Sequence, residues 1–199
     1  LHRQVNDWFS REALAAAIAP HASATEQVAL DWMAKAGKRW RPFLAVCAYS
    51  ALSGDHTLSR QADLRKVAMA VECFHKASLI HDDIEDGDRE RYGEQTLHAE
   101  HGVPIALNVG DLLLGEGYRL LGEVDAPDAC KVKLLRAAAE GHRSLCLGQG
   151  SELAWMRAPK LQRVSEVLDI FRMKTAPAFE VALSLGAILA GCDEQVRTV

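Results

Sequence analysis

The sequence lacks the features that mark secreted, membrane-spanning or nucleic-acid-binding proteins. Its five cysteines are scattered and contain no CxxC pair, which favours buried thiols in a reducing compartment over a disulfide framework. No secretory hydrophobic region opens the chain, and no apolar run is long enough to span a bilayer. No basic patch is interleaved with aromatic residues, which argues against a nucleic-acid partner. These absences predict a cytoplasmic protein.

The periodicity of the apolar residues indicates helices throughout, and no convincing period-two pattern predicts a strand. The expected helices span about residues 5–19, 25–36, 42–52, 59–86, 104–121, 128–157 and 165–190. Gly37 is expected to cap the second helix, and residues 88–102 are expected to form a loop. A length of 199 residues suits one domain with a sizeable core. The sequence therefore predicts a single all-α bundle over residues 1–199.

Acidic residues gather at the end of the long helix expected at 59–86. Asp82 and Asp86 lie one turn apart there, so they repel each other unless a cation sits between them. Hard oxygens in this arrangement suit magnesium, which keeps some waters and shares phosphate ligands. His75 falls on the same helical stripe, roughly 10 Å from Asp82. The alternatives are a solvated acidic helix end and a histidine satisfied within the core.

Basic residues occur in two places that suit phosphate oxygens. Lys38, Arg39 and Arg41 lie between two expected helices and offer ammonium and guanidinium donors, although no Walker loop is present. Arg91 follows the acids in the polar loop, from which it would reach a diphosphate bound there. The alternatives are a solvated junction for the first group and surface salt bridges for Arg91.

The last expected helix contains Lys174 and Thr175 just before Pro177. Proline there removes a backbone hydrogen bond to the carbonyl of Met173 and bends the helix at the lysine. A bend beside a cation and a hydroxyl indicates a site, and bending over a curved core is the alternative. The run GQGSE at 148–152 similarly indicates either a bend that faces a site or close helix packing.

Together these residues resemble the trans-isoprenyl diphosphate synthases, or polyprenyl synthetases. The matching motifs, in the order of the family, are GKRWRP (37–42), FHKASLIHDDIED (74–86), RYG (91–93), QTLH (95–98), NVGDLLL (108–114), GQGSEL (148–153) and KTAP (174–177). They cover nearly the whole chain. The resemblance implies the isoprenoid-synthase type of helical bundle and, as is usual in that family, a homodimer.

The resemblance also implies a reaction, in which an allylic diphosphate ionises with Mg²⁺ on its leaving group and isopentenyl diphosphate attacks the allylic cation. Stabilising that charge requires an electrostatic site for pyrophosphate and an apolar chamber without water. Small residues occupy the positions just before the acidic motif, Ala77 and Ser78, where short-chain synthases often place an aromatic floor. The expected product is therefore geranylgeranyl diphosphate or longer.

The family's functional residues can be placed on this sequence position by position. The residues implied to bind magnesium are Asp82 and Asp86, with Asp83 as a supporting metal-site residue. Those implied on the allylic side are Arg91, Gln149, Lys174 and Thr175, the last two facing the developing charge. Those implied to bind isopentenyl diphosphate are Lys38, Arg41 and His75.

Three departures from the family pattern limit this transfer. Tyr92 stands where many members have a second arginine, and Lys76 is an unexpected charge that we place toward solvent or a dimer partner. The second aspartate-rich motif of the family does not occur before Val199. We therefore expect a C-terminally truncated prenyltransferase, with a non-catalytic regulatory subunit of a heteromeric synthase as the alternative. A terpene cyclase fits less well, because it has no isopentenyl diphosphate for GKRWRP to hold.

Overall fold

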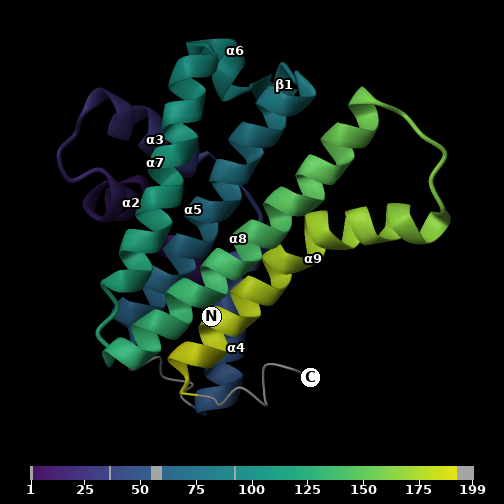
Figure 1. Ribbon diagram of the computed structural model, residues 1–199. Helices are drawn as coiled ribbons and strands as arrows, with labels where there is room; N and C mark the ends of the chain where they lie inside the picture. The colour runs from purple at the N-terminus through teal and green to yellow at the C-terminus, as the bar shows by residue number, and fades with distance from the viewer. Residues whose placement is uncertain (1, 36, 55–59, 92, 192–199) are drawn as a thin grey trace. The chain divides into compact units, whose positions relative to one another are not determined.

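The computed structural model describes residues 2–35, 37–54, 60–91 and 93–191. Helices dominate this part of the chain, and they confirm the predicted all-α class (Figure 1). The elements are α1 (His2–Asp7), α2 (Arg11–Ile18), α3 (Ala24–Ala34), α4 (Trp40–Ser53), α5 (Gln61–Asp86), β1 (Glu90–Arg91), β2 (Glu94–Gln95), α6 (Leu97–His101), α7 (Val103–Gly122), α8 (Asp128–Arg157) and α9 (Val164–Leu189).

The chain divides into two compact units, each assembled from two stretches of sequence. The first unit comprises Leu1–Phe43 and Arg60–Val124, and the second comprises Leu44–Ser59 and Asp125–Val199. Helix α4 begins in the first unit and continues in the second. A single domain over residues 1–199 stays a prediction.

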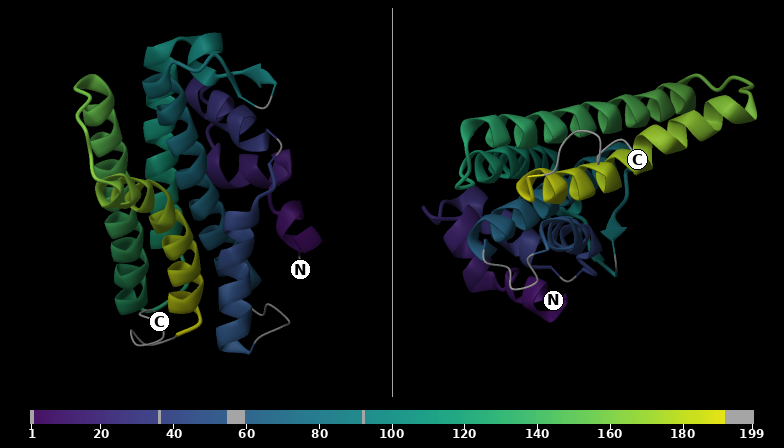
Figure 2. Two further views of the ribbon diagram at one scale, coloured as in Figure 1. Left: turned by 90° about the vertical axis from the view of Figure 1, so that its right-hand side faces the viewer. Right: turned by 90° about the horizontal axis from the view of Figure 1, so that it is seen from below.

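Helices α5 and α7 lie side by side and antiparallel in the first unit (Figures 1 and 2). Two glycines of α7 meet large side chains of α5: Gly110 faces the imidazole of His81, and Gly117 faces the ring of Phe74. A Cβ atom at Gly117 would lie only 2.5 Å from Cε1 of Phe74. The Phe74 ring also meets Tyr118 edge to face, with centroids 5.0 Å apart. Missing side chains on α7 thus let the two helices approach closely.

The N-terminal segment differs from the single helix expected at residues 5–19, and that prediction was wrong. Helix α1 ends at Asp7, and Ser10 then caps α2 by accepting a hydrogen bond from the backbone N–H of Ala13 at 3.2 Å. A serine side chain satisfies one of the free amides that begin a helix, so it favours a new start over continuation. The apolar residues on both sides of the break keep a helical spacing, which concealed it.

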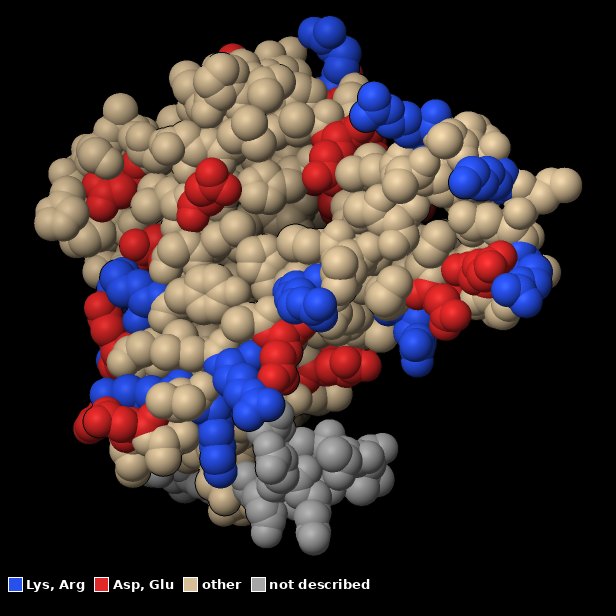
Figure 3. All heavy atoms as spheres, in the orientation of Figure 1, with Lys and Arg blue, Asp and Glu red and all other residues tan. Residues whose placement is uncertain are grey.

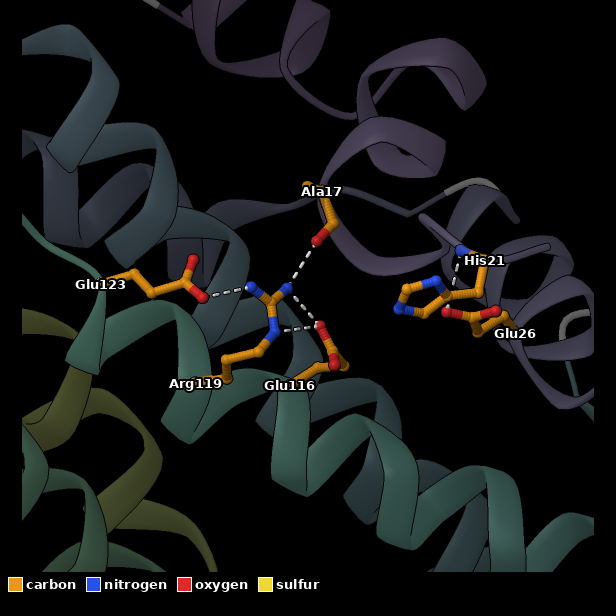
Figure 4. A network of polar contacts seen from close by, with 6 residues as sticks. All are labelled: Ala17, His21, Glu26, Glu116, Arg119 and Glu123. Carbon is orange, nitrogen blue, oxygen red and sulfur yellow. Dashed lines mark hydrogen bonds and ion pairs between the residues drawn. The ribbon is translucent and has the colours of Figure 1, made fainter. Parts of the chain in front are cut away.

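Arg119 of α7 attaches the N-terminal helices to the rest of the first unit (Figure 4). Its Nη2 donates to the carbonyl of Ala17 at 2.6 Å, while Glu116 and Glu123 bind the same guanidinium at 2.5 and 2.8 Å. A capping box between Ser23 and Glu26 then starts α3. One arginine on α7 therefore holds both its own acidic neighbours and the end of α2.

Helices α8 and α9 are antiparallel partners in the second unit (Figures 1 and 2). Gly141 and Gly148 of α8 face Val181 and the backbone at Met173, so the two helices approach where α8 has no side chain. Figures 1 and 2 show α9 bent near its middle, and the helix contains Pro177 as predicted. Gly186 of α9 likewise lies against the Ala45 carbonyl of α4.

None of the helices in the described ranges is long and apolar enough to cross a bilayer. Basic and acidic side chains are interspersed on the face shown in Figure 3, which agrees with the mild net charge of -4. Cys73 is buried, which raises the pKa of its thiol, and Cys47 and Cys130 are half-buried. The prediction of buried thiols was wrong for Cys146, which is exposed, and Cys192 lies outside the described residues.

Candidate active site

The end of α5 carries the acidic motif and turns directly into a small hairpin. Gly87 stops the helix in a left-handed conformation, with φ of 71°, and its N–H bonds the carbonyl of Asp83. Strands β1 and β2 then pair antiparallel, and Thr96 closes them by donating its hydroxyl to the carbonyl of Asp88 at 2.8 Å. The expectation of a plain loop at 88–102 was wrong, because two-residue strands are too short to show a period.

The hairpin brings Arg91 back over the helix end, where it binds Asp83. Its Nε and Nη2 lie 2.6 and 2.5 Å from Oδ1 of Asp83, and that carboxylate is only 1% exposed. Charge-assisted bonds of this kind fix both groups. The structure therefore places Asp83 in contact with Arg91, which suits the supporting role. Direct binding of a metal by Asp83 stays a prediction, as does binding of a diphosphate by Arg91.

Asp82 and Asp86 share a face of the last turns of α5, as their spacing predicts. Asp82 is half-buried and Asp86 is exposed. Within the described ranges, no three histidine, cysteine or acidic side chains lie close enough to hold a metal ion. Two carboxylates without a third ligand do not make a closed protein cage. They fit magnesium, which binds through one or two carboxylates and completes its shell with waters and phosphate oxygens.

Arg41 and His75, both predicted to bind isopentenyl diphosphate, are brought together by α4 and α5. Arg41 Nη1 lies 3.1 Å from His75 Nε2. Burial lowers the pKa of His75 to about 3, and the positive charges of Arg41, Lys76 and Arg91 act in the same direction. The imidazole is thus neutral at pH 7. Because a guanidinium only donates, Nε2 accepts from Arg41, and Nδ1 carries the proton. Lys38, three residues before Arg41 in the sequence, is exposed.

The predicted chain-length residues follow on the same helix. Ala77 is completely buried, and Ser78 is half-buried with its hydroxyl donating to the carbonyl of His75 at 2.8 Å. They lie between His81 and Phe74, the two side chains that face glycines of α7. Helical spacing therefore directs this part of α5 toward α7.

A buried charge cluster beside this site was missed by the sequence analysis. Glu72 is 2% exposed, and its Oε1 lies 3.9 Å from Nη1 of Arg39. Lys76 is 5% exposed, so the expectation of a solvent-facing or partner-facing Lys76 was wrong. An acid within the apolar run of α5 was the available signal, since buried acids need a partner. Arg39 itself has a left-handed backbone, with φ of 46°. Gly37 was expected to cap α3, but that prediction was wrong, because the C-cap of α3 is Lys35.

The second unit contains the remaining predicted residues. Lys174 of α9 binds Glu152 of α8, with Nζ 2.5 Å from Oε2. A Cβ atom at Gly148 would lie 2.6 Å from the backbone nitrogen of Lys174, so the GQGSE run serves close helix packing at the lysine. Gln149 is half-buried and Thr175 is exposed. Glu152 belongs to the GQGSE run noted in the sequence, but its ion pair with Lys174 was not predicted.

The first unit thus combines two kinds of candidate binding group along α5, the second of them completed by Arg41 of α4. Carboxylates that suit a divalent cation occupy the end of α5, and a guanidinium with a neutral imidazole lies about two turns earlier. Groups of the first kind suit a metal with phosphate ligands, and groups of the second kind suit an anion.

Comparisons with known proteins identify relatives of this chain. A short chain isoprenyl diphosphate synthase of Methanocaldococcus jannaschii is 33% identical over 165 residues, which cover 81% of this chain and 47% of the relative. A geranylgeranyl pyrophosphate synthase of Geoglobus acetivorans is 32% identical over 171 residues, which cover 86% of this chain and 52% of the relative. The chain spans about half the length of these curated relatives.

Solved structures share the fold. The geranylgeranyl pyrophosphate synthetase of Geoglobus acetivorans superposes with a TM-score of 0.84 at 29% identity, covering 99% of this chain and 61% of that one. An FPP/GFPP synthase of Zymomonas mobilis gives a TM-score of 0.87 at 26% identity, covering 99% of this chain and 72% of that one. The family model described as polyprenyl synthetase matches residues 23–199. The chain belongs to the polyprenyl synthetase family.

Proposed function

We propose that the protein is a magnesium-dependent prenyltransferase, which condenses isopentenyl diphosphate with an allylic diphosphate to give geranylgeranyl diphosphate or a longer product. The observation that carries this proposal is the order of groups along α5, with His75 and its Arg41 partner about two turns before Asp82 and Asp86. Two diphosphates held at the two positions bring their reacting carbons together. The relatives described above are named as synthases, which supports an enzyme over a regulatory subunit.

The acidic end of α5 is the proposed allylic side. Asp82 and Asp86 would hold Mg²⁺, which would neutralise the charge that develops on the leaving diphosphate. Asp83 keeps Arg91 over this end through two hydrogen bonds to one oxygen. Lys174, Thr175 and Gln149 of the second unit are the proposed further groups on the allylic side. Glu152 binds the ammonium of Lys174 and thereby restricts its orientation.

Lys38, Arg41 and His75 are the proposed contacts of isopentenyl diphosphate. Arg41 contributes charge, while His75 contributes a neutral Nδ1–H donor because its Nε2 already accepts from Arg41. A neutral histidine avoids adding a further buried cation to this cluster. A cytoplasmic location and a homodimer complete the proposal.

The test is a turnover assay of the complete protein with isopentenyl diphosphate and allylic diphosphates of ten, fifteen and twenty carbons. We expect condensation that requires Mg²⁺, is abolished by a chelator and is restored by added Mg²⁺, because two carboxylates alone leave the leaving group's charge unneutralised. Product formation measured without divalent cation, or none with any allylic substrate, contradicts the proposed function.

Replacing Ala77 by phenylalanine is expected to shorten the product. Ala77 lies on the part of α5 that faces α7 and is completely buried, so an aromatic ring there occupies volume that a growing chain needs. The measurement is the chain length of the products by chromatography. Ser78→Phe tests the same floor at a half-buried position, and Ala62→Phe, on an exposed turn of the same helix, is the control. An unchanged product distribution in both folded variants at positions 77 and 78 contradicts the chain-length assignment.

A further inference from the structure

We propose that Lys76 is a positioning residue for isopentenyl diphosphate binding. It holds the end of α3 in place and thereby sets the conformation of the segment Lys38–Arg41, which begins three residues after the C-cap Lys35. The inference rests on the proposed function only for the identity of the diphosphate.

Lys76 and Trp32 join α5 to the last turn of α3 by two hydrogen bonds that run in opposite directions. The ammonium of Lys76 donates to the carbonyl of Lys35 at 3.3 Å, and the indole Nε1 of Trp32 donates to the carbonyl of Lys76 at 3.0 Å. The same ammonium lies 5.4 Å from the centroid of the Trp32 ring. A cation is favourable at this position because the carbonyls that end a helix carry partial negative charge. Lys76 therefore fixes where α3 ends.

Arg39 also contacts the end of α3. Its Nη2 donates to the carbonyl of Met33 at 3.4 Å, and its guanidinium lies 4.5 Å from the centroid of the Phe9 ring. The backbone of Arg39 is left-handed, which is unfavourable for a residue with a side chain and persists only where the surroundings hold it. Lys38 precedes this residue, and Arg41 follows two positions later. The conformation of Arg39 therefore decides how both phosphate-binding cations are presented.

Glu72 couples the two cations that hold the helix end. It lies one turn before Lys76 on the same face of α5, and its Oε1 lies 3.9 Å from Nη1 of Arg39. Burial raises the pKa of Glu72, while the charges of Arg39, Lys76 and Arg41 oppose that effect. One buried carboxylate thus balances several cations. Removing the charge of Lys76 abolishes its hydrogen bond to the carbonyl of Lys35 and also changes the electrostatic environment of Arg39. Both changes are expected to alter the conformation of the segment Lys38–Arg41.

The test compares Lys76→Met with Lys76→Arg in the complete protein. Methionine keeps an unbranched side chain of similar length without charge, so packing is largely preserved. We expect Lys76→Met to raise the KM for isopentenyl diphosphate about tenfold, which is the scale of losing a hydrogen bond from a charged group. The KM for the allylic substrate and kcat are expected to stay within about twofold. Lys76→Arg restores the donor and the wild-type KM.

Lys66→Met is the matched control, because Lys66 lies on the same helix and also donates to a backbone carbonyl, that of Glu123 at 2.5 Å. This control is expected to leave the KM for isopentenyl diphosphate unchanged. An unchanged KM in Lys76→Met overturns the inference. It is equally overturned if KM for both substrates, kcat and the free energy of unfolding all change together, since that pattern indicates general packing.

A second measurement does not depend on turnover. Trypsin cleaves after lysine and arginine except before proline, so cleavage after Lys38 and Arg39 reports how firmly the segment Lys38–Arg41 is held, whereas the bond between Arg41 and Pro42 is not cut. We expect cleavage after Lys38 and Arg39 to be faster in Lys76→Met than in the wild type and in Lys66→Met, and faster too in Trp32→Phe, which removes the indole N–H together with part of the buried ring. Equal cleavage rates refute the positioning role. Absence of isopentenyl diphosphate turnover in the wild type refutes the proposed function instead, and the cleavage rates then still decide on Lys76.

Discussion

Asp82→Asn in the complete protein is expected to lower kcat for prenyl transfer by about a hundredfold to a thousandfold. An amide of the same shape removes one negative hard-oxygen ligand from the pair that Asp82 and Asp86 form on the last turns of α5. The free energy of unfolding is expected to change by less than about 0.5 kcal/mol, because losing the repulsion between the two carboxylates offsets small local losses. Activity and stability therefore separate at this residue.

The measurement is kcat as a function of Mg²⁺ concentration, with urea unfolding of the same preparation. We expect the Mg²⁺ concentration for half-maximal rate to rise in Asp82→Asn. Asp88→Asn is the control, because Asp88 is exposed just beyond the Gly87 cap and off the acidic face. A wild-type rate in Asp82→Asn at limiting Mg²⁺, or an equal loss in the control, would show that this helix end is not the metal site.

Gly148→Ala is expected to lower the free energy of unfolding by about 1–3 kcal/mol. The new Cβ atom would lie 2.6 Å from both the nitrogen of Lys174 and the carbonyl carbon of Met173. Both are backbone atoms, so no side-chain rotation relieves the contact, and α8 and α9 must separate there. The ammonium of Lys174 is then displaced relative to Glu152, which also predicts a loss of activity.

Gly150 provides the matched control two residues later on α8. A Cβ atom at Gly150 meets nothing within 4 Å. Gly150→Ala is therefore expected to raise the free energy of unfolding by up to about 1 kcal/mol, since alanine is the better helix former. Opposite signs in urea unfolding of the two variants support close packing at Gly148. Equal stabilisation by both substitutions would mean that the helices do not meet there.

The helices were predictable where the sequence marks both their ends. Helix α8 runs over the expected residues 128–157, because Pro127 precedes it and Pro159 follows its last turn. Gly87 similarly marked the end of α5. The break at Ser10 was missed because the apolar residues before and after it keep the spacing of one helix. The hairpin after α5 was missed because a two-residue strand is too short to show an alternating pattern.

For the candidate site, the sequence predicted which residues share a helical face better than which residues they contact. The spacing of Asp82 and Asp86 is a local property of one helix and needed no tertiary information. The pairs Asp83 with Arg91 and Lys174 with Glu152 depend on how a hairpin and two helices pack. Periodicity does not encode such contacts, and opposite charges on a sequence offer many equivalent pairings.

The bond from Arg119 to Ala17 joins residues that are 102 positions apart in the chain. At a synthesis rate of about 5–20 residues per second, α2 leaves the ribosome about 5–20 s before its partner arginine does. Isolated helices as short as α1 and α2 are only marginally stable in water, and in that interval they lack the contact with Arg119 that helps to hold them. Arg65 of α5 can bind the carbonyl of Ala13 earlier, but the bond from Arg119 to Ala17 must wait for α7. The segment from α1 to α2 therefore completes its packing only after α7 has been made.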